Sequence, residues 1–236
     1  MQASSKRIFF NSVVKKNGQI WITIYSCSIF LFSIRNVRSI YFVLDDLSTA
    51  LTGWMKEEFD SMGADYSQRG LVTDEHLSFL SKSSSNSSPE YQGKYINTSG
   101  MRLYPQTLNS RSIPIWVGGN SNRAFIRTVK YGAAWHGINL TPPEIIRCQE
   151  RLKRICESHQ KDYSEIGITL RATVRITDKL KHSCGERPYL TGSLGQIETD
   201  LQEYKKSGLD YLIISMAGDT TEQVMTSISR FADSFL

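Results

Sequence analysis

The second half of the chain alternates short apolar runs with amphipathic segments. The apolar runs lie at residues 113–117, 133–138, 166–176 and 211–214, and their length and β-branched content predict buried strands. After each run, apolar residues recur every three or four positions, which predicts a helix. Strands that alternate with helices favour parallel pairing with right-handed crossovers. The pattern fits either an open doubly wound sheet or part of a (β/α)8 barrel.

The predicted helices of this half have a start signal and apolar faces. Thr141-Pro142-Pro143-Glu144 has the Ser/Thr-x-x-Glu capping pattern, with proline at the first helical position. Helical spacing places one set of residues on the buried face of the helix that follows and a second set on the buried face of the last helix. The two sets are Ile145, Cys148, Leu152 and Ile155, and Val224, Met225, Ile228, Phe231, Ala232 and Phe235.

The region before residue 113 is less regular. Residues 54–62 predict a helix that ends at Gly63, and residues 73–82 predict a second helix. The serine-rich run at residues 81–88 predicts a solvated loop, and the glycines within residues 91–104 indicate a short hairpin.

The N-terminal segment carries an apolar, β-branched run at residues 20–34. This run is shorter than the about 20 apolar residues that a membrane span needs, so the sequence argues against a span. We expect a buried strand pair or a poorly ordered segment here, followed by a connecting piece at residues 36–50. A complete barrel takes roughly 250 residues. Residues 1–53 therefore cannot hold the further strand–helix units that would close one.

Composition and charge narrow the class of partner. The chain has 236 residues, of which 40% are hydrophobic and 22% charged, and this composition supports the core of a soluble domain. The net charge of +5 is spread along the helices, so we predict no nucleic-acid partner, although a phosphorylated small molecule would be attracted. The four cysteines show neither a CxxC pair nor metal-ligand spacing, so we predict no metal site and a reduced, cytoplasmic setting.

Gly118-Gly119-Asn120-Ser121 is the strongest local candidate for a binding site. It follows a predicted strand and opens a predicted helix, where free backbone N–H groups and the helix dipole hold anions. Glycine lets the backbone come close to a phosphate, and the Ser121 hydroxyl adds a donor. The alternative is an ordinary N-cap by Asn120 or Ser121 after a tight turn. The residues alone do not separate the two.

Other titratable residues give weaker signals, and none of them identifies a catalytic residue. His136 ends a strand, where it would face the ligand in a barrel, but a hydrogen-bonded structural histidine is the more common case. Arg171 and Arg175 fit either a phosphate contact in the barrel interior or the polar face of a half-exposed strand. The other candidates are expected to be solvated, and they are His76, His159, His182, Glu57 and Glu58.

Several segments taken together resemble one known family, the luciferase-like monooxygenases, and within it the branch that uses the deazaflavin coenzyme F-420. They occur in the order that the family shows and cover residues 53–236. The segments are Gly53-Trp54-Met55-Lys56-Glu57-Glu58-Phe59, Arg69-Gly70, Thr73-Asp74-Glu75, Tyr91-Gln92-Gly93-Lys94-Tyr95, Arg102-Leu103-Tyr104-Pro105, Pro114-Ile115-Trp116-Val117-Gly118-Gly119, Tyr131-Gly132-Ala133-Ala134-Trp135-His136, Leu190-Thr191-Gly192-Ser193 and Gly208-Leu209-Asp210-Tyr211-Leu212.

The resemblance implies an α/β fold, a partial TIM (β/α)8 barrel of the luciferase-like type. Family members bind FMN or coenzyme F-420 at the C-terminal ends of the strands. They transfer a hydride to or from the flavin ring, or activate oxygen on it, with a small molecule as substrate. On the matching positions, Gly118, Gly119, Asn120 and Ser121 would help to hold the phosphate of the cofactor.

The chain departs from the family in its N-terminal part. Residues 1–52 form an atypical segment in which the family's first three strands have no counterpart, and the fourth strand is reduced to Leu51-Thr52-Gly53. We therefore expect a luciferase-like domain at residues 53–236. A truncated barrel exposes strand edges and helix faces, which favours a homodimer. Two functions stay open: a flavin- or deazaflavin-dependent oxidoreductase or monooxygenase, and a catalytically inactive remnant that serves as a binding or structural fragment. A third, weaker alternative is an unrelated open α/β sheet whose Gly-Gly turn binds some other phosphate.

Overall fold

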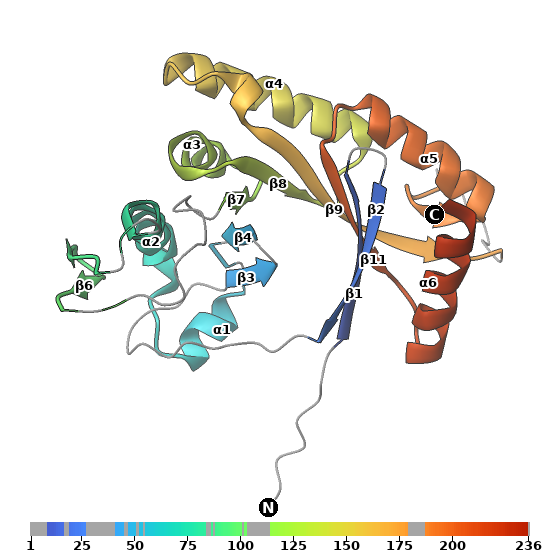
Figure 1. Cartoon of the computed structure of the whole chain (residues 1–236), viewed down its shortest axis with the longest axis horizontal. Helices are drawn as coiled ribbons and strands as arrows, with labels where there is room; N and C mark the ends of the chain where they lie inside the picture. Colours follow the sequence, from blue (N-terminus) through green and yellow to red (C-terminus); the bar gives the residue numbers. More distant parts are fainter. Residues whose placement is uncertain are drawn as a thin grey trace, which may run out of the picture. The chain divides into compact units, whose positions relative to one another are not determined.

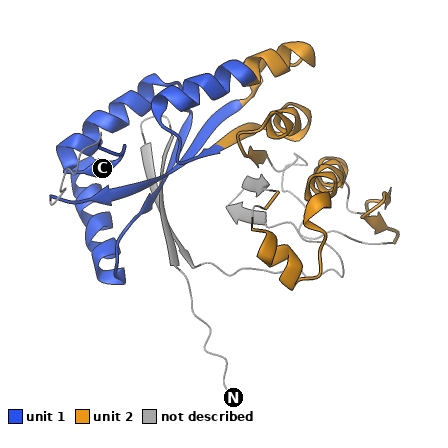
Figure 2. Ribbon diagram, turned by 180° about the vertical axis from the view of Figure 1, so that it is seen from behind, with its two compact units in different colours: residues 1–29, 137–151, 167–236 blue, residues 30–136, 152–166 orange. Residues whose placement is uncertain are grey.

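The computed structural model describes two compact units, which Figure 2 colours separately. It describes the backbone of residues 9–16, 19–26, 41–44 and 47–50, and the complete residues 52–53, 55–83, 86, 88–100, 102, 114–178 and 187–235. Unit 1 consists of residues 1–29, 137–151 and 167–236, and unit 2 consists of residues 30–136 and 152–166. Strand β8 (Ala134–Ile138) and helix α4 (Pro142–Ser158) contribute residues to both units.

Parallel strands form the sheet of unit 2. Strand β7 (Ile115–Gly118) pairs in parallel with β4 (Leu47–Ala50) on one side and with β8 on the other. Strand β3 (Tyr41–Leu44) adds to β4 in the antiparallel direction. The remaining elements of this unit are α1 (Lys56–Ser61), the 3-10 helices η1 (Tyr66–Gln68) and η2 (Tyr163–Glu165), α2 (Arg69–Ser83), the hairpin of β5 (Tyr91–Gln92) and β6 (Asn97–Thr98), and α3 (Asn122–Tyr131).

Unit 1 is built on the parallel pair β9 (Gly167–Ile176) and β11 (Tyr211–Met216). The short strand β10 (Thr191–Gly192) extends the parallel pairing at the end of β9. Strand β1 (Phe9–Lys16) joins β11 in the antiparallel direction, and β2 (Gln19–Ser26) pairs with β1. Helices α5 (Leu194–Lys206) and α6 (Thr221–Phe235) follow β10 and β11 and cover the sheet (Figure 1).

The end of β8 is joined to β9 within unit 1. The backbone N–H of Asn139, just after β8, donates to the carbonyl of Arg171 at 2.8 Å. The side-chain oxygen of Asn139 accepts from the backbone N–H of Thr173 at 3.0 Å. The predicted alternation of strands and helices with parallel pairing is therefore confirmed for the strands after residue 113.

Burial along β9 shows which of its faces packs against helices. Ile168, Leu170, Ala172 and Val174 are all buried, whereas the opposite face is buried at Thr169 and becomes exposed at Thr173 and Arg175. The predicted apolar face of α4 is also confirmed, because Ile145, Cys148 and Leu152 are buried there. A strand face covered by apolar helix faces is what a parallel sheet requires.

Four details of the sequence prediction are wrong. Residues 36–50 contain two strands, β3 and β4, instead of a connecting piece, because β4 pairs with β7 far along the chain. The strand beside β7 is thus Leu47–Ala50, before the expected Leu51-Thr52-Gly53. Helix α2 continues to Ser83, into the expected loop. Met225 is 48% exposed, and the smaller Ser227 takes a buried place on α6.

The N-terminal apolar run forms a strand over part of its length. Strand β2 covers Gln19–Ser26 and pairs with β1, as expected of a strand pair, while residues 27–34 lie outside the described part. Among the described residues, no helix combines the length and the apolar character needed to cross a membrane.

Candidate functional site

The turn between β7 and α3 is tight and depends on glycine. Gly119 has a φ of +115°, a backbone conformation that residues with a side chain rarely adopt. A Cβ atom on Gly119 would lie 3.2 Å from the Cβ of Ala124, so a side chain would also crowd the first turn of α3. Between the end of the strand and the start of the helix, the backbone at Gly119 therefore has no side chain over it.

Ser121 caps helix α3. Its side-chain oxygen accepts from the backbone N–H of Ala124 at 3.2 Å, and its carbonyl accepts from Phe125 at 3.1 Å. The N-cap alternative from the sequence is therefore confirmed for Ser121, although capping by the hydroxyl leaves its own backbone N–H available. The four predicted phosphate contacts, of Gly118, Gly119, Asn120 and Ser121, stay a prediction.

Several backbone donors of the turn are unused. The N–H groups of Asn120, Ser121 and Arg123 donate to no other described residue. Asn120 and Ser121 are exposed, and the first turn of α3 carries no acidic residue but does carry Arg123. Unused amides at the positive end of a helix dipole are suited to a phosphate group. The residues present therefore fit the phosphate of a flavin or deazaflavin nucleotide.

Two consecutive residues of β8 hold the peptide groups on either side of Gly119. The indole N–H of Trp135 donates to the carbonyl of Gly119 at 2.8 Å. The backbone N–H of Gly119 donates to the carbonyl of His136 at 3.4 Å. Trp135 is fully buried and meets the ring of Phe125 edge-on, with ring centroids 5.7 Å apart.

His136 is a buried residue at the end of β8. Register pairs it with Gly118, and its ring lies against Trp116 at a centroid distance of 5.7 Å and an angle of 34°. Trp116 and His136 therefore share the sheet face that is opposite to Trp135. The sequence placed His136 at the strand end, and the structure places it beside the glycine turn.

Arg171 and Arg175 have polar partners within unit 1. The Nε of Arg171 donates to the hydroxyl of Ser215 on β11 at 3.1 Å. Arg175 lies 3.6 Å from the carboxylate of Asp219, and both of these side chains are exposed. These contacts favour a polar face of the sheet over a dedicated phosphate contact.

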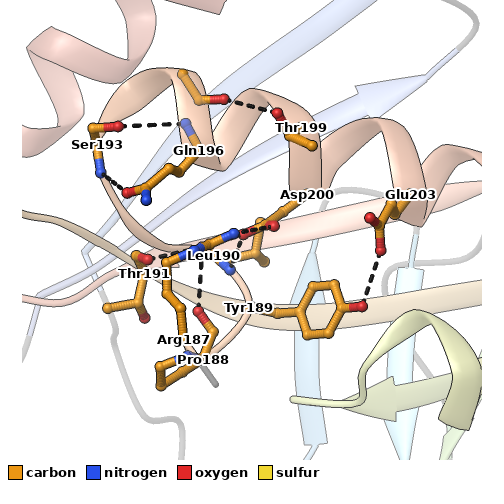
Figure 3. A network of polar contacts seen from close by, with 11 residues as sticks. Arg187, Pro188, Tyr189, Leu190, Thr191, Ser193, Gln196, Thr199, Asp200 and Glu203 are labelled. Carbon is orange, nitrogen blue, oxygen red and sulfur yellow. Dashed lines mark hydrogen bonds and ion pairs between the residues drawn. The ribbon is translucent and has the colours of Figure 1, made fainter. Parts of the chain in front are cut away.

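A second set of polar contacts secures the segment after β9 (Figure 3). Two nitrogens of Arg187 donate to the two carboxylate oxygens of Asp200, at 2.7 and 2.6 Å. The side chain of Asp200, on α5, is only 4% exposed, and it also accepts from the backbone N–H of Leu190 at 2.7 Å. The ion pair raises the pKa of Arg187. We call Arg187, Leu190 and Asp200 the clamp.

The clamp fixes the backbone beside the end of β9. The carbonyl of Leu190 accepts from Arg175 and that of Gly192 accepts from Thr177, both at 2.9 Å. Sequence reasoning missed the clamp, although a signal was present. Asp200 stands at helical spacing after the buried Ile197 and before the buried Tyr204, where an apolar residue is expected.

The remaining candidates lie in ordinary surroundings, with one correction. His76 is 3% exposed, so the expectation of a solvated side chain is wrong, and burial lowers its pKa. His159, Glu57 and Glu58 are exposed, as expected, and His182 lies outside the described residues. Within the described part of the chain, no three His, Cys, Asp or Glu side chains form a group that could hold a metal ion.

The part of the sequence that forms this turn matches one known protein family. A family model described as luciferase-like monooxygenase matches residues 50–182, more than half of the chain. No curated protein sequence matches the chain. The matched residues include β7, the turn at Gly119, α3 and β8.

Solved structures share the fold at low sequence identity. An F-420-dependent secondary alcohol dehydrogenase, in complex with an F-420–acetone adduct, aligns with a TM-score of 0.53 and 11% identity over 68% of this chain and 61% of its own. A coenzyme F-420-dependent tetrahydromethanopterin reductase from Methanopyrus kandleri aligns with a TM-score of 0.53 and 11% identity, over 78% of this chain and 72% of its own. Monooxygenase RslO1 from Streptomyces bottropensis aligns with a TM-score of 0.60 and 10% identity, over 78% of this chain and 65% of its own.

These likenesses confirm the predicted fold class. Together with the parallel strand–helix units, they show part of a (β/α)8 barrel of the luciferase-like type. The chain spans 61% of the length of the alcohol dehydrogenase and 65% of the length of the monooxygenase. At this level of identity the similarity concerns the fold alone.

Proposed function

This chain belongs to the luciferase-like monooxygenase family, and on that premise we propose that it is an oxidoreductase that uses coenzyme F-420 or FMN. The observation that carries the proposal is the turn at Gly118, Gly119, Asn120 and Ser121. It lies within the family match and combines a glycine at φ +115° with unused backbone N–H groups. When bound, such a cofactor supplies a ring that accepts or donates a hydride.

The similar structures support the class of reaction. Two are described as F-420-dependent, one a secondary alcohol dehydrogenase and one a tetrahydromethanopterin reductase, and a third as a monooxygenase. The dehydrogenase and the reductase use the same deazaflavin on different small molecules. We accordingly propose a small-molecule substrate without choosing between dehydrogenation, reduction and oxygenation.

The chain's own residues have a limited role in this proposal. The amides of Asn120 and Ser121 bind the phosphate, the dipole of α3 stabilises its charge, and Arg123 adds a positive charge at the helix start. By holding the phosphate at the end of β7, these residues would orient the rest of the cofactor toward the strand ends, where barrel active sites lie. Cys148 and Cys156 are free thiols, which supports a reducing, cytoplasmic setting.

The proposal is tested by loading the purified chain with coenzyme F-420 or FMN and then removing unbound cofactor by gel filtration. We expect one of the two cofactors to stay with the protein and its bound absorbance to change when an alcohol or a reduced nicotinamide nucleotide is added. Loss of both cofactors at protein and cofactor concentrations in the tens of micromolar range would contradict the proposal. Binding without any spectral change would instead favour the inactive binding fragment.

A further inference from the structure

We propose that Trp135 is a positioning residue for the phosphate-binding turn, holding the peptide between Gly119 and Asn120 so that the Asn120 N–H faces the ligand. The proposal rests on the proposed function, because it assigns a task to a residue beside that site. Trp135 itself is fully buried, so we place its effect on the turn and not on the ligand directly. Its effect passes through one hydrogen bond to the backbone of the turn.

The geometry follows from the planarity of the peptide group. The carbonyl of Gly119 accepts from the indole N–H of Trp135 at 2.8 Å, so this carbonyl points toward the Trp135 side chain. In a trans peptide the carbonyl and the N–H of the next residue point in opposite directions. The N–H of Asn120 therefore points away from Trp135, and it donates to no other described residue.

The turn needs such an anchor because of its sequence. Gly119 has no side chain to pack, and glycine has access to many backbone conformations. The neighbouring peptide group is held separately, since the N–H of Gly119 donates to the carbonyl of His136 at 3.4 Å. Together these two contacts orient both peptide groups of Gly119 before any ligand arrives, and binding an anion then requires little reorganisation.

Trp135 is itself held rigidly. Register pairs it with Val117 of β7, which is buried, and Phe125 of α3 meets its ring edge-on at 5.7 Å and 71°. The indole thus bridges the strand before the turn and the helix after it. A phenylalanine at position 135 would keep an aromatic ring in this core but would lack the N–H donor.

The test compares ligands that differ only by the phosphate. Kd values for FMN and for riboflavin are measured by equilibrium dialysis with the wild-type chain, W135F and F125L. Phe125→Leu is the matched control, because it removes volume from the same core and leaves the indole N–H in place. The ratio of the riboflavin Kd to the FMN Kd reports the phosphate contact and is independent of losses that weaken both ligands equally.

We expect the wild-type chain to favour FMN, W135F to reduce that preference by about two- to tenfold, as for the loss of one hydrogen bond, and F125L to keep it. An unchanged preference in W135F, or an equal reduction in F125L, overturns the role of Trp135 while the phosphate site stands. If the wild-type chain binds FMN and riboflavin equally, the phosphate site fails, and the positioning role fails with it.

A measurement on the unaltered chain covers the case in which W135F does not fold. In a spectrum of the ¹⁵N-labelled protein, FMN should shift the indole N–H resonance of Trp135 together with the amide resonance of Asn120, because the indole donates to the carbonyl of the peptide group that carries the Asn120 N–H. Riboflavin should leave both in place. A shift of the Asn120 amide without any response of the Trp135 indole contradicts the proposal.

Discussion

The turn after β7 and the segment after β9 both follow a parallel strand, but they differ in whether their backbone polar groups have hydrogen-bond partners. In the turn, the N–H groups of Asn120 and Ser121 have no partner among the described residues. In the segment that ends at Gly192, the N–H of Leu190 donates to Asp200 of the clamp, and the carbonyls of Leu190 and Gly192 accept from Arg175 of β9 and from Thr177 just after it. The first arrangement leaves donors for a ligand, whereas the second uses its groups to stabilise the fold.

This difference teaches how to separate a binding turn from a structural one when both contain glycine at positive φ. Gly119 and Gly192 have φ values of +115° and +144°. Backbone conformation alone does not distinguish them. The distinguishing feature is whether the donors around the glycine already have partners, because buried or secured donors gain little from a ligand.

The largest effect is expected at the clamp. Asp200→Ala removes a nearly buried carboxylate, leaving the buried N–H of Leu190 and the guanidinium of Arg187 without it. The free energy of unfolding should fall by about 2–4 kcal/mol, measured by urea denaturation.

Glu203→Gln is the control for Asp200→Ala, since the exposed carboxylate of Glu203 accepts from the hydroxyl of Tyr189 and, unlike that of Asp200, holds no backbone N–H among the described contacts. It should change the free energy of unfolding by less than about 0.5 kcal/mol. Equal effects of the two substitutions would mean that the clamp is not a stabilising element.

A smaller loss of stability, with a change in ligand preference, is expected at the turn. Gly119→Ala forces a side chain to φ +115° and brings its Cβ within 3.2 Å of Ala124. We expect a loss of about 1–3 kcal/mol in the free energy of unfolding and a loss of the preference for FMN over riboflavin. Both are measured on the same preparation.

Gly195→Ala is the matched glycine control, because nothing lies within 4 Å of a Cβ at this position of α5. Here alanine should stabilise the helix by about 0.5–1 kcal/mol. The FMN preference should not change. A Gly119→Ala variant that behaves like Gly195→Ala would show that the turn tolerates side chains and would remove the basis for the site.

The two helix caps give the next smaller effect. Ser121 caps α3 and Ser193 caps α5, the latter as a full capping box with Gln196. Replacing either serine with alanine should lower the free energy of unfolding by about 1 kcal/mol. Only Ser121→Ala should also weaken FMN relative to riboflavin in dialysis, because it keeps the Ser121 N–H but removes the cap that fixes the start of α3 beside the phosphate-binding amides. Equal ligand effects from both would place the binding contribution outside the turn.

The smallest effect concerns pH and the buried His76. Burial lowers its pKa below the ordinary 6.5, so the unfolded chain binds a proton that the folded chain resists. The contribution of His76 to the free energy of unfolding is therefore fully present above pH 6.5, and it declines as the pH falls below 6.5. Urea denaturation at several pH values should show a shallower decline for His76→Gln. An identical slope in the variant would contradict the burial of this imidazole.

The sequence predicted the parts of the fold that depend on local pattern. Apolar runs gave β7, β8, β9 and β11, and the stripe of Ile145, Cys148 and Leu152 gave the buried face of α4. The position of the glycine turn followed from the same pattern. These features lie within a few residues of one another, so periodicity and turn chemistry are enough to predict them.

The parts that were missed depend on contacts between distant residues. Strand β4 has four residues and includes Ser48 and Thr49, and its place in the parallel sheet depends on pairing with β7, more than 60 residues further along the chain. The bond from Trp135 to Gly119 spans 16 residues, and that from Arg187 to Asp200 spans 13. No local pattern encodes such pairs.

For His76, in contrast, the local sequence pattern did indicate that the side chain is buried. The buried residues of α2 include Thr73, His76 and Leu77, which stand at helical spacing. The spacing thus marks one face, but two of the three side chains are polar, and a hydrophobicity pattern gives them little weight. Sequence reasoning would have found this face by testing spacing before polarity.

Titration of the ¹⁵N-labelled chain with FMN, followed at the backbone amides of both strand ends, tests the phosphate site most directly. We predict that the Asn120 and Ser121 resonances shift and saturate, that riboflavin does not move them, and that the Leu190 and Thr191 resonances stay in place. Amides at Asn120 and Ser121 that do not respond while FMN is bound, or a response at Leu190 and Thr191 instead, would contradict the assignment of the glycine turn as the phosphate site.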